Sequence, residues 1–263
     1  MSYDWVSFTT DYGLADGFVA ACTGVIGRIA PHVRVIDISH DVPPQDVRRG
    51  AVVLAQTVPH LPPAVHLAVV DPGVGTARRG LVVVTGNGVL VGPDNGLLLP
   101  AATALGGIVA AHELTESEYW LPEVSRTFHG RDVFAPVTAH LARGVPPERF
   151  GPAIPPEELV VLPEPRVVVE PGRVDTEVLT VDHFGNLQLA ATAADWARSG
   201  LDGTGRVRLA GREVRVGGTF ADARPGELVV YVDSAGRLAV AVNGGNAAAE
   251  LGLRSGASVL IEG

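Results

Sequence analysis

The residues best suited to chemistry are an aspartate, an arginine and a histidine, each in a glycine-containing segment. Asp71 follows a run of apolar residues, and Arg78 comes seven positions later, after a turn with two glycines. His129 stands between Phe128 and Gly130. Glycine lets the backbone approach a ligand closely, and histidine can orient water or accept its proton near neutral pH. Taken singly, each also fits an ordinary turn, a solvated arginine or one of eight structural histidines.

Two further turns carry side chains that could bind a ligand. Asp11 follows residues 6–9, which predict a buried strand, and its two carboxylate oxygens suit a ribose diol. It could equally cap the helix that is expected to begin near Asp16. In residues 182–186, Asn186 offers the donor and acceptor that read an adenine edge, although a plain β-turn fits as well.

Two other polar pairs are interpreted as structural. Residues 93–96 are typical of a turn in which Asp94 and Asn95 hydrogen-bond their own backbone. Arg131 and Asp132 precede a helical pattern, and we interpret them as its cap.

Apolar runs and helical patterns alternate through the first half of the chain. β-Branched residues predict buried strands, and apolar residues at helical spacing predict helices between them. Such alternation is typical of a parallel sheet with helices on its faces. The expected strands are residues 6–9, 33–38, 65–70 and 81–85, and the expected helices are residues 16–30, 46–58 and 133–143.

Prolines mark the boundary of this α/β region. Eight of the twenty prolines lie in residues 146–171, a segment that can be neither helix nor central strand. Short strand candidates separated by glycine-rich turns follow it and predict an antiparallel β-barrel. They are residues 174–181, 206–209, 213–216, 228–233, 238–243 and 258–262. We expect an N-terminal α/β domain over residues 1–162, a proline-rich linker over 163–173 and a C-terminal β-barrel domain over 174–263.

Composition excludes several classes of function. A net charge of −9 argues against nucleic acid or an anionic membrane as a partner. The stretch of residues 96–111, which holds neither a charged residue nor a histidine, is too short and too broken by Pro100 to span a bilayer. Residues 1–5 lack the pattern of a secretion signal, so we expect a soluble, cytoplasmic protein.

The sequence also lacks the signatures of common cofactor sites. Cys22 is the single cysteine, so an intrachain disulfide or a cysteine-based metal site cannot form. No GxGxxG, P-loop or HExxH motif occurs, and the acidic residues and histidines do not fall into metal-ligand spacing. We expect neither a metal nor a cofactor.

Taken in chain order, the segments resemble one family. This is the S-adenosyl-L-methionine (SAM) hydrolase, or SAM hydroxide adenosyltransferase, family, which is related to the fluorinases and chlorinases. The resemblance is carried by residues 8–13, 70–79, 93–98, 127–132, 182–186 and 219–223. It implies an α/β domain with a mostly parallel sheet, a smaller β-barrel domain, and a homotrimer with its active site at the subunit interface.

The resemblance also implies the reaction and its catalytic residues. The family's Asp-Arg-His triad matches Asp71, Arg78 and His129, although only the seven-residue offset favours Arg78 over Arg79. SAM is the substrate, and a positioned water attacks the ribose 5′ carbon in line, releasing adenosine and L-methionine. Asp71 and His129 would accept hydrogen bonds from this water, and either could take its proton.

Substrate contacts carry over from the same resemblance. Asp11 would hold the ribose hydroxyls, Asp16 and Ser234 the methionine end, and Asn186 the adenine edge. Ala235 replaces an arginine of the fluorinases, which puts the methionine carboxylate contacts in doubt. The remaining expected contacts are Phe128, Phe184 and Phe220, which would surround the adenosyl group, together with Gly130, Asp182 and Asn243.

Three alternatives remain open from the sequence. The first is a SAM-dependent halogenase on the same scaffold, but halogenases carry tyrosine in place of Asp71 and fluorinases insert a loop after Arg79 that this chain lacks. A carboxylate at this position would also repel a halide. The second is a non-catalytic protein that binds SAM or a nucleoside. The third is a metal-dependent phosphoesterase.

Overall fold

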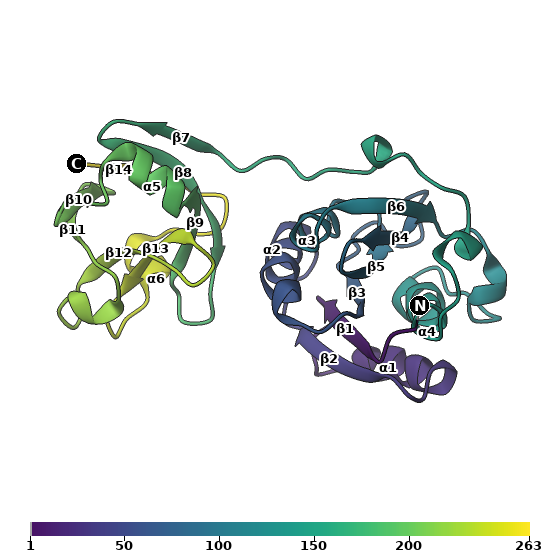
Figure 1. The fold of residues 1–263 in the computed structure, drawn as a ribbon. Coiled ribbons are helices and arrows are strands. Elements are labelled where there is room, and N and C mark those ends of the chain that lie inside the picture. The colour runs from purple at the N-terminus through teal and green to yellow at the C-terminus, as the bar shows by residue number, and fades with distance from the viewer. Residues whose placement is uncertain (1) are drawn as a thin grey trace. The chain divides into compact units, whose positions relative to one another are not determined.

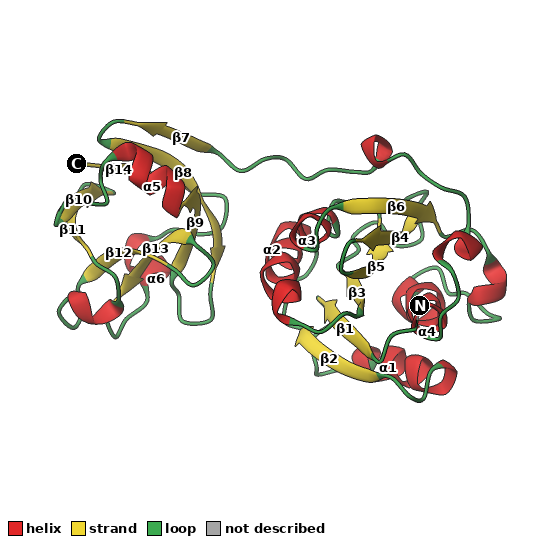
Figure 2. Cartoon of the chain, viewed as in Figure 1, coloured by secondary structure: helices red, strands yellow, loops and turns green. Residues whose placement is uncertain are grey.

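The chain divides into two compact units, residues 1–162 and 163–263. The computed structural model describes residues 2–263, and Met1 lies outside the described residues. Figure 1 traces both units, and Figure 2 shows that helices are more prominent in the first unit than in the second.

A six-stranded mixed sheet forms the centre of the N-terminal unit, in the order β2-β1-β3-β5-β4-β6. The four strands β2, β1, β3 and β5 are parallel, whereas β4 and β6 are antiparallel to their neighbours. The mostly parallel α/β fold expected from the sequence is therefore confirmed. The strands are β1 (Trp5–Thr10), β2 (Arg34–Ser39), β3 (Val65–Val69), β4 (Gly80–Thr85), β5 (Gly88–Pro93) and β6 (Ile108–Glu113).

Helices cover both faces of this sheet. α1 (Phe18–Ile29) and α4 (Ala135–Ala142) contribute to one apolar cluster, and α2 (Val47–Thr57) and α3 (Leu99–Ala104) to the other. The three helices expected from the periodicity are present. Asp46 caps α2, because its Oδ1 accepts the Arg49 N–H at 2.9 Å. A π-helical turn, Gly130–Phe134, leads directly into α4.

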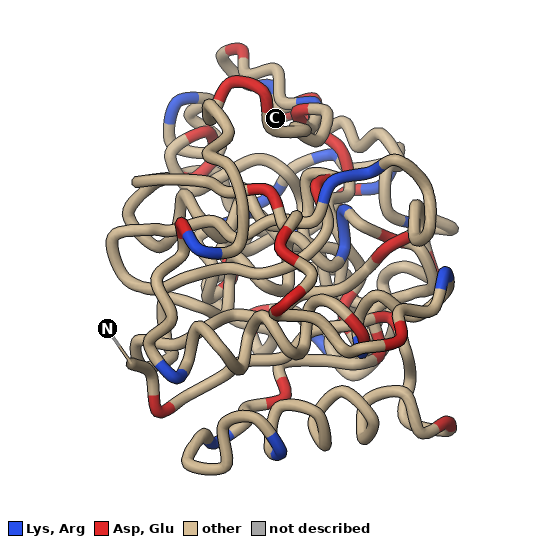
Figure 3. Tube along the Cα trace, turned by 90° about the vertical axis from the view of Figure 1, so that its right-hand side faces the viewer, with Lys and Arg blue, Asp and Glu red and all other residues tan. Residues whose placement is uncertain are grey.

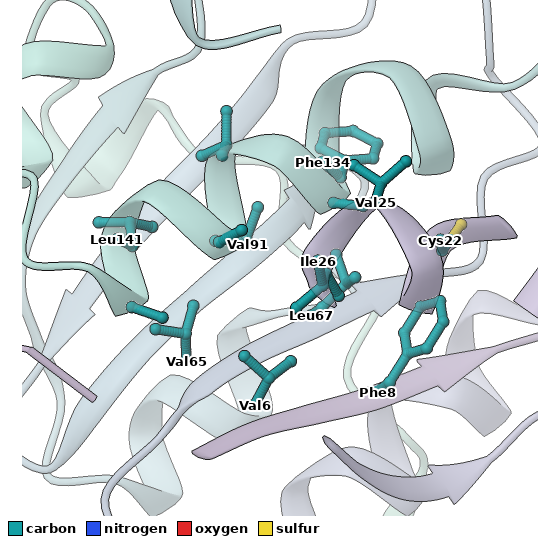
Figure 4. Close-up of a cluster of buried hydrophobic side chains, with 14 of the residues drawn as sticks. Val6, Phe8, Cys22, Val25, Ile26, Val65, Leu67, Val91, Phe134 and Leu141 are labelled. Carbon is teal, nitrogen blue, oxygen red and sulfur yellow. The ribbon is translucent and has the colours of Figure 1, made fainter. Parts of the chain in front are cut away.

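The larger core cluster lies between β1, β3, β5 and the pair α1 and α4. Figure 4 shows Phe8 and Leu67 from the sheet among Ile26 and Phe134 from the helical side. All four side chains are almost fully buried. Since each buried aliphatic or aromatic side chain contributes about 1.5–3 kcal/mol, this cluster supplies the rigid base on which the loops rest.

The sequence prediction missed several elements of the N-terminal unit. β5 and β6 were not expected, and β4 was placed in a parallel alternation although it pairs antiparallel with β5 through a two-residue turn at 86–87. Glycines at both ends of β5 and before β6 obscured the strand pattern, as did the apolar run 96–111 that also contains α3.

The C-terminal unit is a closed β-barrel with one additional edge strand. β14 pairs with both β10 and β8, which closes a ring of seven strands, and β7 pairs only with β8. The barrel is mixed rather than wholly antiparallel as predicted, because β11 and β12 run parallel. The strands are β7 (Val167–Glu170), β8 (Arg173–Val181), β9 (Leu187–Thr192), β10 (Arg206–Leu209), β11 (Arg212–Val216), β12 (Leu228–Val232), β13 (Arg237–Val242) and β14 (Ser258–Glu262).

Two short helices complete this unit. α5 (Ala193–Ser199) begins with a capping box, in which Thr192 and Asp195 satisfy each other's backbone N–H groups. It ends at Gly200, whose φ of 71° is left-handed. α6 (Ala247–Leu251) is capped by Asn246.

The expected linker is partly ordered into secondary structure. β7 lies inside residues 163–173, and single 3-10 turns, Pro147–Phe150 and Pro156–Glu158, interrupt the proline-rich stretch before it. A strand can form there because it lies at a sheet edge, between Pro165 and Pro171, where a missing N–H costs no ladder bond.

Positive and negative charges are interspersed along the chain. Figure 3 shows basic residues scattered among acidic ones along the trace, without an extended basic stretch in that view. Within residues 2–263, no helix is both long and apolar enough to cross a membrane.

A buried histidine in the sheet predicts how stability depends on pH. His66 is 1% exposed, its Nδ1 lies 2.8 Å from the Ser7 hydroxyl, and burial lowers its pKa from 6.5 to about 4. Between these values only the unfolded chain binds a proton at this position. Stability is therefore full above pH 6.5 and falls as the pH drops towards 4.

We predict that the unaltered protein loses about 2 kcal/mol more unfolding free energy than His66→Gln between pH 7 and pH 5. Urea denaturation of both proteins at the two pH values measures the difference. Equal losses in the two proteins would contradict the assignment to His66.

Candidate functional site

The candidate site forms where four parallel strands end. β1, β2, β3 and β5 share one direction, so the residues after them meet at the same edge of the sheet. Asp11 follows β1, His40 follows β2, Asp71 comes two residues after β3, and Asp94 follows β5. Three carboxylates and an imidazole thus converge from sequence positions far apart.

Asp71 and Arg78 form a partly buried ion pair. The Arg78 Nε lies 3.0 Å from both carboxylate oxygens of Asp71, and Nη2 also donates to Oδ2. Only 13% of the arginine side chain and 6% of the aspartate side chain are exposed. This bidentate geometry fixes the plane of the carboxylate. The low exposure of both side chains strengthens their attraction relative to a surface ion pair.

The same guanidinium also binds His129. Arg78 Nη2 lies 3.1 Å from His129 Nδ1. A guanidinium can only donate, so Nδ1 must be the unprotonated nitrogen. The neutral imidazole therefore carries its proton on Nε2. Arg78 thus joins all three residues that the sequence singled out, and it fixes the tautomer of the histidine.

The environment of His129 favours its neutral form. Burial is the largest cause that lowers the pKa of His129 below 6.5, and the positive charge of Arg78 lowers it further. The negative charges of Asp71 and Asp132 oppose the shift in pKa without reversing it. At neutral pH the imidazole remains uncharged, as its hydrogen bond from Arg78 requires.

A glycine allows the two loops that carry the candidate catalytic residues to come into contact. Gly75 has a φ of +75°, and a Cβ at this position would overlap the carbonyl oxygen of Arg126. Because Gly75 has no Cβ, the 71–79 turn can pack against the segment that leads to His129. Arg78 also lies over the ring of Phe134, 5.0 Å from its centroid, which supports the guanidinium from the core side.

The neighbouring arginine has a different set of partners. Arg79 Nε donates to Asp94 Oδ2 at 2.8 Å, and its Nη2 donates to the Glu158 carbonyl at 2.6 Å. Asp94 also accepts the Val160 N–H at 2.9 Å. Asp94 thus does not turn back on its own backbone as expected. Arg79 and Asp94 tie the sheet edge to the proline-rich segment, and only Arg78 reaches Asp71.

Asn95 has the structural role expected of it. Its Oδ1 accepts the Leu97 N–H at 3.2 Å, which closes the turn, and its Nδ2 donates to the Val70 carbonyl at 2.8 Å. The second bond was not foreseen, and it holds the backbone just before Asp71.

Asp132 is fully buried within the π-helical turn and does not cap a helix as predicted. Its carboxylate accepts from Arg131 Nε at 2.6 Å and from the Ser125 N–H at 2.8 Å. It therefore secures the loop that precedes His129 instead.

An aromatic group stands next to the ion pair. The rings of Tyr12, Phe18 and Phe128 contact one another edge to face or tilted, with centroids 5.3–6.0 Å apart. A Cβ on Gly130 would overlap the Tyr12 hydroxyl, so glycine is required where the ring lies. Arg131 lies over Phe128, 4.8 Å from its centroid. The sequence singled out Phe128 and Gly130 but missed Tyr12 and Phe18.

Tyr12 is linked electrostatically to the same centre. Burial raises the pKa of its phenol well above 10.0, and the negative charges of Asp11 and Asp71 raise it further. The tyrosine directly follows Asp11 in the sequence, which is the signal that could have revealed it.

Asp11 and Asp16 differ sharply in their surroundings. Asp11 Oδ2 accepts the Gln45 N–H at 2.8 Å, whereas Asp16 is exposed. Gly17 occupies the N-cap position of α1 without a side-chain bond, so neither aspartate caps the helix. The capping alternative is therefore wrong, and Asp11 is held in place for another reason.

The candidate residues of the C-terminal unit form a tight turn between β8 and β9. Asp182 Oδ1 accepts the N–H groups of Phe184 and Asn186, and its Oδ2 accepts the Asn186 side-chain amide at 2.8 Å. This is the β-turn that the sequence left open as an alternative. It presents Phe184 outward, 72% exposed.

Other candidates of this unit have mixed roles. Phe220 is 44% exposed and lies against Tyr231, with ring centroids 5.2 Å apart. Burial, followed by the charges of Asp182 and Asp233, raises the pKa of Tyr231 to about 12. Asn243 Nδ2 donates to the Ala223 carbonyl at 2.8 Å, which occupies its amide within the barrel.

Ser234 is exposed in the turn between β12 and β13. Asp233 closes that turn by accepting the Ala235 and Arg237 N–H groups, each at 2.9 Å. Among residues 2–263, no group of three or more histidine, cysteine or acidic side chains is arranged to hold a metal ion.

Two family models match this chain. The family described as the SAM hydroxide adenosyltransferase N-terminal domain matches residues 6–151, and the corresponding C-terminal domain matches residues 176–260. The chain is 62% identical to a protein of Salinispora arenicola (strain CNS-205) named (R)-S-adenosyl-L-methionine hydrolase, over 97% of this chain and 96% of that protein.

Two further matches extend the comparison. A fluorinase of Actinoplanes sp. (strain N902-109) is 28% identical over 97% of this chain and 96% of its own. The crystal structure of an uncharacterized conserved protein from Thermotoga maritima matches with a TM-score of 0.90 and 38% identity, covering 98% of this chain and 100% of that one.

The close approach at Gly75 yields a stability prediction. Gly75→Ala combines a left-handed φ with overlap against a backbone oxygen, so we expect it to cost more than about 3 kcal/mol. Gly107→Ala is the matched control, because Gly107 has a φ of +90° with nothing within 4 Å of a Cβ. It should cost only about 1–2 kcal/mol. Chemical denaturation compares the two variants, and equal costs would show that the loop contact is unimportant.

Proposed function

Because the chain belongs to the SAM hydroxide adenosyltransferase family, we propose that it hydrolyses S-adenosyl-L-methionine to adenosine and L-methionine. The observation that carries the proposal is the Arg78 guanidinium bound to both Asp71 and His129. The 62% identical relative named (R)-S-adenosyl-L-methionine hydrolase supports the substrate and favours its (R) sulfonium epimer.

The reaction does not require the protein to supply a general acid. A sulfonium is already an activated leaving group, so methionine can depart without protonation. The protein must supply a positioned water and a shaped, dry cavity. Holding water and the 5′ carbon in line can contribute up to about 7–11 kcal/mol.

The hydrogen bonds of Arg78 suggest how the triad divides its work. His129 Nδ1 is occupied by Arg78, so its Nε2–H is a donor that can hold the water oxygen. Asp71 has further lone pairs and is the acceptor for a water proton. We therefore propose Asp71 as the proton acceptor and His129 as the orienting donor, rather than two equivalent acceptors.

Substrate contacts are proposed for both units. In the N-terminal unit, Asp11 would bind the ribose hydroxyls and Phe128 would contact the adenosyl group. Asp16, being exposed, could still meet the charged methionine end. In the C-terminal unit the proposed contacts are Asp182, Phe184, Asn186, Phe220, Ser234 and Asn243.

The proposed function also assigns a role to each domain. Residues 1–162 carry the triad, and residues 174–263 supply the remaining substrate contacts. The active form is a homotrimer whose sites lie at subunit interfaces, a proposal that rests on resemblance to the family. Equilibrium sedimentation of the full chain tests it directly.

The proposed reaction is tested by its products. We expect oxygen-18 water to give labelled adenosine and free methionine, with (R)-SAM consumed faster than the (S) epimer. Chromatography with mass detection follows both products. Unlabelled adenosine would contradict attack by water, and 5′-chloro-5′-deoxyadenosine formed in chloride would favour a halogenase instead.

Removing the proposed proton acceptor should slow the chemical step. Asp71→Asn keeps the size of the side chain but weakens it as a base, so we expect kcat to fall about 100- to 10,000-fold with a nearly unchanged KM. Arg79→Gln is the matched control, because Arg79 pairs with Asp94 and not with Asp71. Steady-state kinetics gives kcat and KM for both variants. Equal losses of kcat would remove Asp71 from its proposed role.

The rate should depend on the protonation of His129. Protonation at Nδ1 would place two positive groups against each other and break the Arg78 bond. Since the pKa of His129 is lowered, we expect kcat to stay level near pH 7 and to fall only at pH values below 6.5. A kcat profile from pH 4.5 to 8 measures this. An acid limb that persists unchanged in His129→Asn would belong to another group.

A further inference from the structure

We propose that residues 40–46 act as a clamp on Asp11, with His40, Thr10 and the Gln45 N–H as positioning groups for ribose recognition. The proposal rests on the proposed function in one respect, namely that Asp11 binds the ribose hydroxyls. The clamp holds the carboxylate in place before any ligand arrives.

The first part of the clamp is a hydrogen-bond chain that is buried at Thr10 and His40. The Thr10 hydroxyl, at the end of β1, lies 2.9 Å from His40 Nδ1, and His40 Nε2 lies 3.0 Å from Asp37 Oδ1. Thr10 Oγ1 also accepts the Tyr12 N–H at 3.2 Å. A carboxylate can only accept, so the imidazole donates from Nε2, and its unprotonated Nδ1 accepts the hydroxyl proton of Thr10. This chain joins the ends of β1 and β2.

The backbone of His40 holds the other side of the same turn. Its carbonyl accepts the Gly13 N–H at 2.8 Å. The two residues that follow Asp11 are thus fixed by two bonds, in which Tyr12 donates to the Thr10 hydroxyl and Gly13 donates to the His40 carbonyl. Gly13 has a φ of +65°, which glycine adopts without strain. The backbone on both sides of Asp11 is therefore tied to β1 and to residue 40.

The third contact acts on the carboxylate itself. The Gln45 N–H donates to Asp11 Oδ2 at 2.8 Å. Gln45 has a φ of 67°, a left-handed conformation that costs a non-glycine residue free energy. Such strain persists only where surrounding contacts impose it. The Val47 N–H to the Gln45 carbonyl, at 2.9 Å, and the Asp46 N–H to the Pro43 carbonyl, at 3.0 Å, impose it here.

Together these contacts hold the carboxylate ready for a diol. One lone pair of Oδ2 is occupied by an N–H of a rigid segment, so the rotation of the side chain is fixed. Each carboxylate oxygen has two lone pairs, so acceptors remain for two hydroxyls. A group fixed in advance binds more tightly, because ordering it costs nothing when the ligand arrives.

The structure offers a matched control on the same strand. Ser7 and His66 form a second buried hydroxyl–imidazole pair, at 2.8 Å, between β1 and β3. His66 lies within β3, not at the carboxyl edge of the sheet, and the pair makes no contact with Asp11. Thr10→Val and Ser7→Ala each remove one buried hydroxyl from β1, but only Thr10→Val releases the clamp.

The experiment measures how strongly the full-length protein distinguishes adenosine from 2′,3′-dideoxyadenosine. Calorimetry gives both dissociation constants for the unaltered protein, Thr10→Val, Thr10→Ser and Ser7→Ala. We expect Thr10→Val to weaken adenosine binding about 10-fold with little effect on the dideoxy nucleoside. Thr10→Ser and Ser7→Ala should keep the unaltered ratio. With SAM, Thr10→Val should raise KM with kcat nearly unchanged.

Three outcomes would overturn the clamp. A ratio in Thr10→Val equal to that of the unaltered protein would show that Thr10 does not position Asp11. Equal loss of the ratio in Ser7→Ala would show a general loosening of the sheet. No discrimination in the unaltered protein would remove the ribose role of Asp11. Nucleoside binding needs no turnover, so a protein that discriminates but does not hydrolyse SAM would refute the proposed reaction and leave the clamp standing.

Discussion

The candidate site depends on one guanidinium. Arg78 binds the carboxylate of Asp71 through two nitrogens and also donates to His129 Nδ1. Because the pair is mostly removed from water, either partner left alone would be a costly buried charge. Around Arg78, the ring of Phe134 lies on one side, and Gly75 lets the 71–79 turn reach the segment before His129. The positions of these loops therefore depend on the interactions of one side chain, Arg78.

This arrangement links the fold to the proposed chemistry. Parallel strands bring Asp11 and Asp71 to one edge, where one carboxylate is suited to a diol and the other to a water proton. Arg78 sets the tautomer of His129, and burial together with the charge of Arg78 lowers the pKa of His129, so the imidazole is a neutral donor at physiological pH. Under the proposed function, the carboxylate of Asp71 favours water over a halide, because it would repel an anion.

Local pattern was sufficient to predict part of this structure. The strands before Asp11 and Asp71, the helix capped by Asp46 and the seven-residue offset of Arg78 are all visible in the sequence, and the structure contains each. Contacts between distant residues were not predictable. The pairing of Arg79 with Asp94, the left-handed Gln45 and the parallel pair β11–β12 depend on tertiary packing, which leaves no periodic signal.

Arg78 holds His129 as the neutral Nε2–H tautomer. Nitrogen-15 NMR of histidine-labelled protein at pH 7 reads this directly, because protonated and unprotonated ring nitrogens differ widely in chemical shift. His129→Asn identifies the signal among the eight histidines. We predict an unprotonated Nδ1 and a protonated Nε2 in the unaltered protein. In Arg78→Gln the ring should lose its preference for this tautomer. A protonated Nδ1 in the unaltered protein would contradict the account.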